Sequence, residues 1–441
     1  MNKIKQLWSN LRSNFWVMPL LIVVVSIIFA AALIKADSIV NNRWLAQWPY
    51  LFGVGAEGAR GMMITIAGSM MSVVGVTFSM ILVVLALASS QYTSRILRNF
   101  IRSRVTQVVL GIFAGIFTYC LIVLRTIRSG NDSVFVPSLA VLFGFVLALG
   151  GVVTLMFFIH HIAFSIQASS IIASVAQETI AAVDRFFPEN PEQEADDDDD
   201  AQSMHYQVEW NWRTISTKKN GYIQSVNNAA LIRLAQEKKT IVRMERSIGA
   251  FVVRNTPLVS IDLKDPPDEE TIASLQAAFT INHYRTVQQD VAFGIRQIVD
   301  VALKALSPGI IDITTAVMCI DYLTVILARI ANRKIYSSHY YEEGKLLVIA
   351  MGPSYQSLLS ESFDQIRNSA KGVVSIMLRI LESFQTLAGL TVNPCRRRAI
   401  SEQVKLIAEL AEQTVESVYD RTRIDTLLAS VVKTLEVKQV L

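Results

Sequence analysis

The sequence predicts an α-helical membrane domain with four transmembrane helices, followed by an α+β cytoplasmic domain with a small β module and a helical C-terminal part. The 441 residues are 52% hydrophobic and 18% charged, which is too apolar for an ordinary soluble protein. Four apolar segments long enough to cross a bilayer all lie in the first 165 residues. The second half is more polar and shows both strand and helix patterns.

The four expected membrane helices lie at about residues 15–34, 61–90, 107–125 and 134–162. The first is interpreted as a retained helix rather than a signal peptide, because it is about 20 residues long and three more spans follow. The loop after the second span is rich in arginine and contains no acidic residue. By the positive-inside rule, this loop and both chain termini are expected in the cytoplasm.

The second span carries small side chains at alternating steps of four and three residues. This spacing places them on one face of a helix, and they are Gly61, Thr65, Gly68, Ser72, Gly75 and Ser79. The simpler interpretation is close helix packing within one subunit, since small residues allow helix backbones to approach each other in lipid. The alternative is that copies of this face surround an axis and line a narrow polar pore.

Arg95, Arg98 and Arg102 share one helical face in the loop after the second span. They are expected to set the topology and to contact anionic lipids, or alternatively to attract anions at a pore mouth. His160 and His161 project about 100° apart on a helix, so they cannot both bind one metal ion. Their simpler role is that of polar residues at the membrane interface, and a role in proton transfer is the alternative. No metal site or cofactor is expected.

The remaining chain divides into three parts. Residues 166–204 are expected to form an amphipathic helix that extends the fourth span, followed by an acidic linker. Residues 205–264 are expected to form a small β-rich module, whose spacing resembles the barrel-sandwich modules of lipoyl and biotinyl domains but lacks their carrier lysine. Residues 265–441 are expected to be mainly helical, with a short β-hairpin within 335–351.

Two blocks of sequence resemble a widespread family of bacterial membrane proteins known as domain of unknown function 2254. The first block runs from Ser89 to Phe100, and the second from Arg285 to Gly309. The family-like residues of the second block and its continuation are Asp290, Arg296, Ser307, Pro308, Gly309 and Asp312. The family pattern continues Gly-Ile-Asn-Asp-Pro, whereas this chain has Ile311 and Ile313 around the aspartate. The resemblance implies a bacterial inner-membrane location and the architecture above, and it implies no particular activity.

No phosphate-binding loop, metalloprotease motif, nucleophile elbow or Cys/His cluster occurs, so an enzyme is not expected. Nucleic acid is not an expected partner either, because no basic stripe with interleaved aromatic residues is present. The leading hypothesis is a homo-oligomeric channel or transport-like protein in the lipid bilayer, with a regulatory cytoplasmic domain. The alternative is a membrane-anchored scaffold or sensor whose 200–441 region binds a cytoplasmic protein partner.

Overall fold

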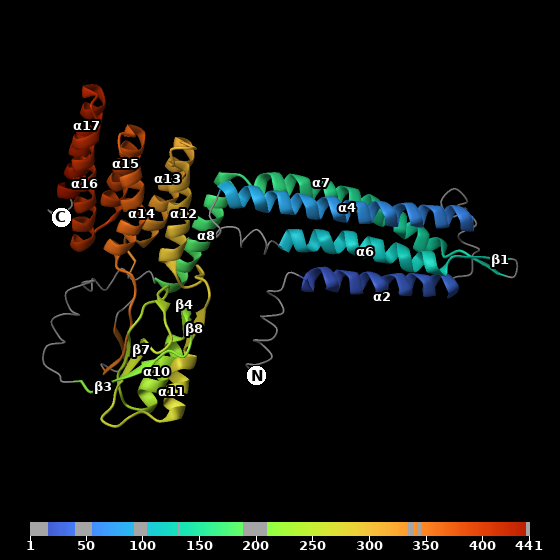
Figure 1. Ribbon diagram of the computed structural model, residues 1–441, viewed down its shortest axis with the longest axis horizontal. Coiled ribbons are helices and arrows are strands. Elements are labelled where there is room, and N and C mark those ends of the chain that lie inside the picture. Colours follow the sequence, from blue (N-terminus) through green and yellow to red (C-terminus); the bar gives the residue numbers. More distant parts are fainter. Residues whose placement is uncertain are drawn as a thin grey trace. The chain divides into compact units, whose positions relative to one another are not determined.

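The computed structural model describes residues 16–39, 55–91, 104–130, 133–187, 210–333, 335, 339–342 and 345–437. The chain divides into an N-terminal unit, Met1–Gln167, and a C-terminal unit, Ala168–Leu441. Each unit has a core of its own, and the helices and strands of both are drawn in Figure 1.

The N-terminal unit consists of long apolar helices and one short hairpin (Figure 1). The helices are α2 (Val17–Ile39), α4 (Ala56–Gln91), α6 (Arg104–Thr126) and α7 (Ser138–Ser165), and the hairpin pairs β1 (Arg128–Gly130) with β2 (Ser133–Phe135). Helix α6 packs against the other three helices. Half of the residues in its most apolar stretch are therefore buried, compared with 11–17% in the other three helices. The apolar side chains of α2, α4 and α7 therefore form most of the exterior, as expected for helices surrounded by lipid.

Five helices in the described part of the chain are long and apolar enough to cross a membrane, one more than the four predicted. The fifth is α13 (Ile313–Ile330), which lies in the C-terminal unit. Its buried residues face α8 (Ala168–Phe186), α12 (Val291–Ala305) and α15 (Val374–Leu390). Its Asp321 pairs with Arg379 at 2.5 Å. The sequence analysis included this stretch in a mainly helical region and did not count it as a span; a core helix buried on several sides can be as apolar as a membrane span.

The helical part of the C-terminal unit is a row of packed helices (Figure 1). These are α8 (Ala168–Phe186), α12 (Val291–Ala305), α13, α14 (Tyr355–Ser369), α15 (Val374–Leu390), α16 (Pro394–Thr414) and α17 (Val418–Val437). Helix α8 was expected to extend the fourth span and lead into a linker. Instead, a turn at Ile166–Gln167 separates it from α7, and its apolar face packs between α12 and α13. The acidic stretch that was expected to follow it lies outside the described residues.

Helix α12 approaches α8 closely at one glycine. A methyl group on Gly294 would lie 2.0 Å from Thr179 Oγ1 and 2.8 Å from Thr179 Cγ2. The far ends of α8 and α13 are joined by ion pairs, because Asp184 accepts hydrogen bonds from Arg329 and Arg333 at 2.8 and 2.9 Å. Helix α8 is thus fixed at its middle and at its end.

The described strands of the C-terminal unit form two sheets rather than the self-contained β module expected over 205–264. The five-stranded sheet has the order β3 (Trp212–Ser216), β7 (Pro257–Asp262), β5 (Val242–Met244), β10 (Lys345–Ile349) and β9 (His339–Glu342). The three-stranded sheet has the order β6 (Phe251–Val252), β4 (Gly221–Val226) and β8 (Phe279–Asn282). Strand β10 pairs in parallel with β5 from about a hundred residues earlier, a long-range contact that sequence pattern does not reveal.

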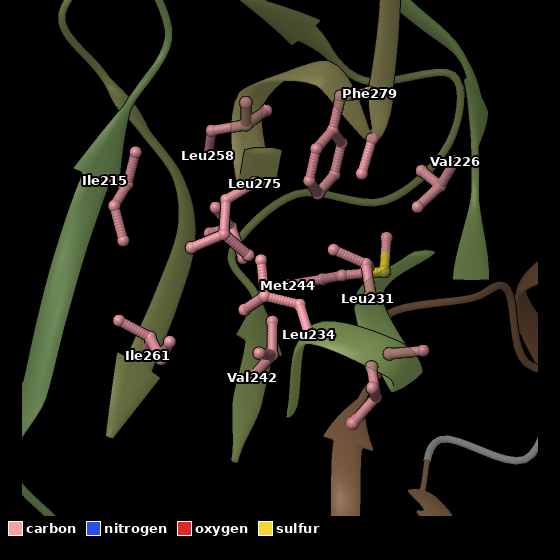
Figure 2. Packing of buried hydrophobic residues seen from close by; sticks show 14 of the residues in the cluster. Ile215, Val226, Leu231, Leu234, Val242, Met244, Leu258, Ile261, Leu275 and Phe279 are labelled. Atoms are coloured by element: carbon pink, nitrogen blue, oxygen red, sulfur yellow. The ribbon is translucent and has the colours of Figure 1, made fainter. Parts of the chain in front are cut away.

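Two helices complete the core of this β part, α10 (Asn228–Glu237) and α11 (Glu269–Ala277). Helix α10 was missed in the sequence, although Asn227 caps it by accepting a hydrogen bond from the Ala230 amide at 3.1 Å. Figure 2 shows leucines from both helices meeting side chains of the sheet, among them Leu231, Leu234, Leu275, Val242, Met244, Leu258 and Ile261.

Candidate functional site

The small-residue face of α4, defined as Gly61, Thr65, Gly68, Ser72, Gly75 and Ser79, is exposed along its whole length. A methyl group on any of its three glycines would meet nothing within 4 Å in the described chain. The buried residues of α4 lie on the opposite side of the helix and are Ala59, Met63, Ala67, Met70, Thr77 and Val84. The packing face of α4 is therefore built from methionine, alanine, valine and one threonine. In the described part of the chain, no helix of the same subunit packs against the small-residue face.

Glycines on the neighbouring helices behave differently. Methyl groups on Gly111 and Gly115 of α6 would lie 2.7 Å from Ile22 Cδ1 and 2.6 Å from Ser26 Oγ of α2. Methyl groups on Gly144 and Gly151 of α7 would also meet neighbouring side chains, at 2.9 and 3.2 Å. Close packing inside this unit thus uses Gly111 and Gly115 of α6 and Gly144 and Gly151 of α7, whereas the glycines of the α4 face and Gly150 of α7 have open space beside them.

The hydroxyl groups on the α4 face are bonded to their own helix. Thr65 Oγ1 donates to the Gly61 carbonyl at 2.8 Å, and Ser72 Oγ donates to the Gly68 carbonyl at 3.1 Å. Donation of the proton in this direction leaves the oxygen lone pairs available on the open side of the helix. The face is thus a line of uncharged acceptors between glycines.

The other residues proposed for the membrane domain have separate surroundings. Arg95, Arg98 and Arg102 lie outside the described residues. His160 is exposed beside the ring of Phe164, and His161 stacks on Phe157. Across the described ranges no group of three His, Cys, Asp or Glu side chains could hold a metal ion.

The family-like residues of the C-terminal unit lie at both ends of α12 and are not brought together. Asp290 caps the start of α12, accepting from the Phe293 amide at 3.0 Å, and Arg296 pairs with Asp300 at 2.9 Å. Ser307, Pro308 and Gly309 lie in the turn beyond its other end. Asp312 then caps α13, and hydrogen bonds from Thr315 hold the pKa of its carboxyl below the ordinary value. The two caps are separated by the 15 residues of α12, about 22 Å.

Asp290 borders a cavity of about 340 Å³ that the sequence analysis did not anticipate. Arg285 donates to both carboxylate oxygens of Asp290, at 2.8 and 2.9 Å. Gly249, with a φ of +84°, lies so close that a methyl group on it would be 2.4 Å from Asp290 Oδ2. Further lining comes from Met351, Gly352 and Pro353. The cavity is thus formed where the β part meets α12 and α14, from segments too far apart in sequence to be associated beforehand.

Comparisons with known proteins agree with the apolar helices of the N-terminal unit. The family model described as "Predicted membrane protein (DUF2254)" matches residues 12–386. Uncharacterized proteins of Mycobacterium bovis and Mycobacterium tuberculosis are each 27% identical over 434 residues, covering 96% of this chain and 81% of theirs. No solved structure matches the chain. The chain belongs to the DUF2254 family of predicted membrane proteins.

Proposed function

We propose that four helices, α2, α4, α6 and α7, cross the membrane, and that copies of the chain associate through the small-residue face of α4 to form a homo-oligomeric channel or transport-like protein. In this proposal the C-terminal unit is cytoplasmic and regulates the assembly. The observation that carries the proposal is the exposure of the complete α4 face, whereas two glycines of α6 and two of α7 lie in close contact with neighbouring helices.

Lipid gives no reason for a helix face to consist of small residues, because large apolar side chains contact lipid tails equally well. Small residues instead allow another helix backbone to approach closely, and such contacts drive helix association in membranes. The stretch from Gly61 to Ser79 is about 27 Å long, close to the ~30 Å thickness of the hydrocarbon core. A second α4 can therefore be contacted through the whole depth of the bilayer.

The hydroxyl oxygens support a pore at this contact. Thr65 and Ser72 present oxygen lone pairs on the open side of α4, as described above. Uncharged oxygens can replace the water around a permeating ion, and binding to them is weak enough to permit release. A ring of α4 helices would thus offer a polar path without a fixed charge.

Cross-linking tests the association. The full-length chain with Cys395→Ser, which removes the exposed cysteine, would carry Ser72→Cys or, as a control, Phe78→Cys. Both positions are exposed, but Phe78 lies about 120° away around the helix. Mild oxidation in membranes should join Ser72→Cys chains and leave Phe78→Cys chains separate, because a disulfide requires Cα atoms within about 7 Å. Equal cross-linking at both positions, or none at Ser72→Cys, would contradict the α4 contact.

Ion flux tests the pore separately. Liposomes containing the wild-type chain should pass small ions, and Ser72→Leu or Gly75→Leu should abolish this flux by filling the contact. Phe78→Leu should conduct as the wild type does. If an assembled wild-type oligomer shows no flux, the channel is refuted while the association stands.

A membrane-anchored sensor is the second candidate, and the cavity beside Asp290 favours it. A cavity of this size lies within the range of small-molecule sites and is bordered by a buried carboxylate and a guanidinium. A small anionic or polar metabolite bound there should raise the unfolding temperature of the full-length chain. Ala250→Phe, which fills the cavity, should remove this increase. If the metabolite raises the unfolding temperature of this variant as much as that of the wild type, the ligand binds elsewhere.

A further inference from the structure

The turn between α12 and α13 presents three isoleucines to solvent. Ile310, Ile311 and Ile313, called here the isoleucine tip, are 49%, 63% and 37% exposed. Ile311 has a φ of +46°, in the left-handed region that β-branched residues strongly disfavour. A left-handed conformation at an exposed β-branched residue is unfavourable for its own fold, which points to a role outside that fold.

The isoleucine tip lies at the end of the bundle where the chain enters it. Arg329 contacts Asp184 across 145 residues, and Arg333 contacts the Phe187 carbonyl across 146. Helix α13 therefore runs parallel to α8. Residues 145 apart in the sequence lie at the same height along the two helices, so Ile313 lies at the height of Ala168, the first residue of α8. Helix α12 runs antiparallel to both, with Gly294 against Thr179, so its last turn reaches the same level.

If α7 spans the membrane, the first residue of α8 must lie close to the membrane surface. Only Ile166 and Gln167 separate α8 from the end of α7, and two residues extend at most ~7 Å. Helix α7 has 28 residues and is about 42 Å long, which matches the ~40–45 Å of a whole bilayer with its headgroups. The chain therefore leaves α7 at the headgroup layer, and Ala168 begins there.

A second apolar tip lies at the same end of the bundle. Asp321–Arg379 and Asn332–Leu390 contacts both join residues 58 apart, so α15 is parallel to α13 and Lys371 is level with Ile313. The adjacent Gly372 amide donates to Thr414 Oγ1, which precedes the start of α17 by four residues. The first two residues of α17, Val418 and Tyr419, are 78% and 72% exposed. An aromatic residue next to an apolar one is typical of membrane interfaces.

We propose that the isoleucine tip inserts into the lipid bilayer interface, with Val418 and Tyr419 as a second contact. This holds the C-terminal unit on the membrane surface by its tips. The exposed charged residues at this end are of both signs: Lys304 and Lys371 are basic, and Asp312 and Glu416 are acidic. Insertion is therefore driven by apolar burial and does not require anionic lipid. The proposal rests on α7 crossing the membrane, and it is independent of the α4 contact.

Fluorescence quenching by lipids tests the proposal. The full-length chain with Cys395→Ser would carry a polarity-sensitive label at Ile310→Cys, in phosphatidylcholine vesicles that contain lipid with a nitroxide near the headgroup. Val392→Cys is the matched control, since it is also an exposed apolar residue but follows α15 at the opposite end of the bundle. The label at 310 should be strongly quenched and blue-shifted, and the label at 392 should not. Phosphatidylserine should change neither result.

Equal quenching at the two positions, or none at 310, would overturn the proposal. A label at 310 that is shielded from a water-soluble quencher yet untouched by nitroxide lipid would also overturn it, and would indicate a protein partner such as a second copy. A further variant, Ile311→Asn, separates membrane contact from folding. Asparagine tolerates the left-handed conformation, so this variant should unfold at a higher temperature while the label at 310 loses much of its quenching. Unchanged quenching in this variant would refute the role of Ile311.

Discussion

Gly294→Ala should destabilise the C-terminal unit through a single contact with Thr179. The new methyl group would lie 2.0 Å from Oγ1, 2.8 Å from Cγ2 and 2.9 Å from Cβ of Thr179, so α8 and α12 must separate. Overpacking of a core costs about 1–3 kcal/mol, and so severe an overlap falls at the upper end. The better helix propensity of alanine returns about 1 kcal/mol, which leaves a net loss of about 2 kcal/mol. For a unit of this size that corresponds to a decrease in Tm of about 4–8 °C.

Thermal unfolding of the full-length chain in detergent, followed by tryptophan fluorescence, measures this loss. Thr179→Ala removes Oγ1 and Cγ2, so the double variant should recover most of the stability that Gly294→Ala loses. Gly389→Ala on α15 is the control, because a methyl group there meets nothing within 4 Å, and its Tm should be unchanged or slightly higher. The reasoning is refuted if Gly294→Ala unfolds at the wild-type temperature, or if Thr179→Ala gives no recovery.

Three further predictions concern single residues of the C-terminal unit. Ile313→Pro should raise the free energy of unfolding by about 0.5–1 kcal/mol, because proline suits the first position of α13 and restricts the unfolded chain; a lower Tm would contradict this. Asp184→Asn should reduce stability at pH 7, since the hydrogen bond from Arg329 lowers the pKa of Asp184. A carboxyl whose pKa is lower in the folded chain stabilises the fold at pH values above its unfolded pKa of ~3.9, and this stabilisation is lost as the pH falls through its folded pKa. The free energies of unfolding of the variant and the wild type should therefore converge in acid. A constant difference between them down to pH 2 would contradict this. Arg397→Lys should lower the free energy of unfolding, measured by denaturant titration, by about 3 kcal/mol. The buried guanidinium donates hydrogen bonds to carbonyls at the C-terminal ends of α15 and α17, and lysine lacks the planar arrangement of donors that makes them. A loss below ~1 kcal/mol would count against this.

The membrane helices and several caps could be predicted from sequence because their signals are local. Apolar runs of about 20 or more residues identified the four helices of the N-terminal unit, and Asp312 before Ile313 is a local signal for the start of α13. The direction of the α4 face could not be predicted. Small residues at 61–79 and buried residues at 59–84 have nearly the same repeat, so the sequence shows two faces of α4 without showing which one meets a neighbour.

Long-range pairing accounts for most of the other differences. Strand β10 joins β5 in parallel, and the cavity collects Gly249, Arg285 and Met351 from three distant segments. Neither arrangement has a local signature, because each depends on how the whole C-terminal unit folds. Helix α10 is different, since its Asn227 cap and apolar spacing were present in the sequence and could have identified it.

Helix α13 carries a consequence for synthesis of the protein in the cell. It is apolar enough to be taken for a membrane span when it leaves the ribosome, before the helices that will cover it are complete. Asp321 lies at its centre, and a carboxylate there adds about 2.5–3.5 kcal/mol to the free energy of membrane insertion. The same carboxylate later pairs with Arg379 of α15. In the proposed four-helix topology, Asp321 thus disfavours insertion of α13 into the membrane and also holds it in the folded C-terminal unit.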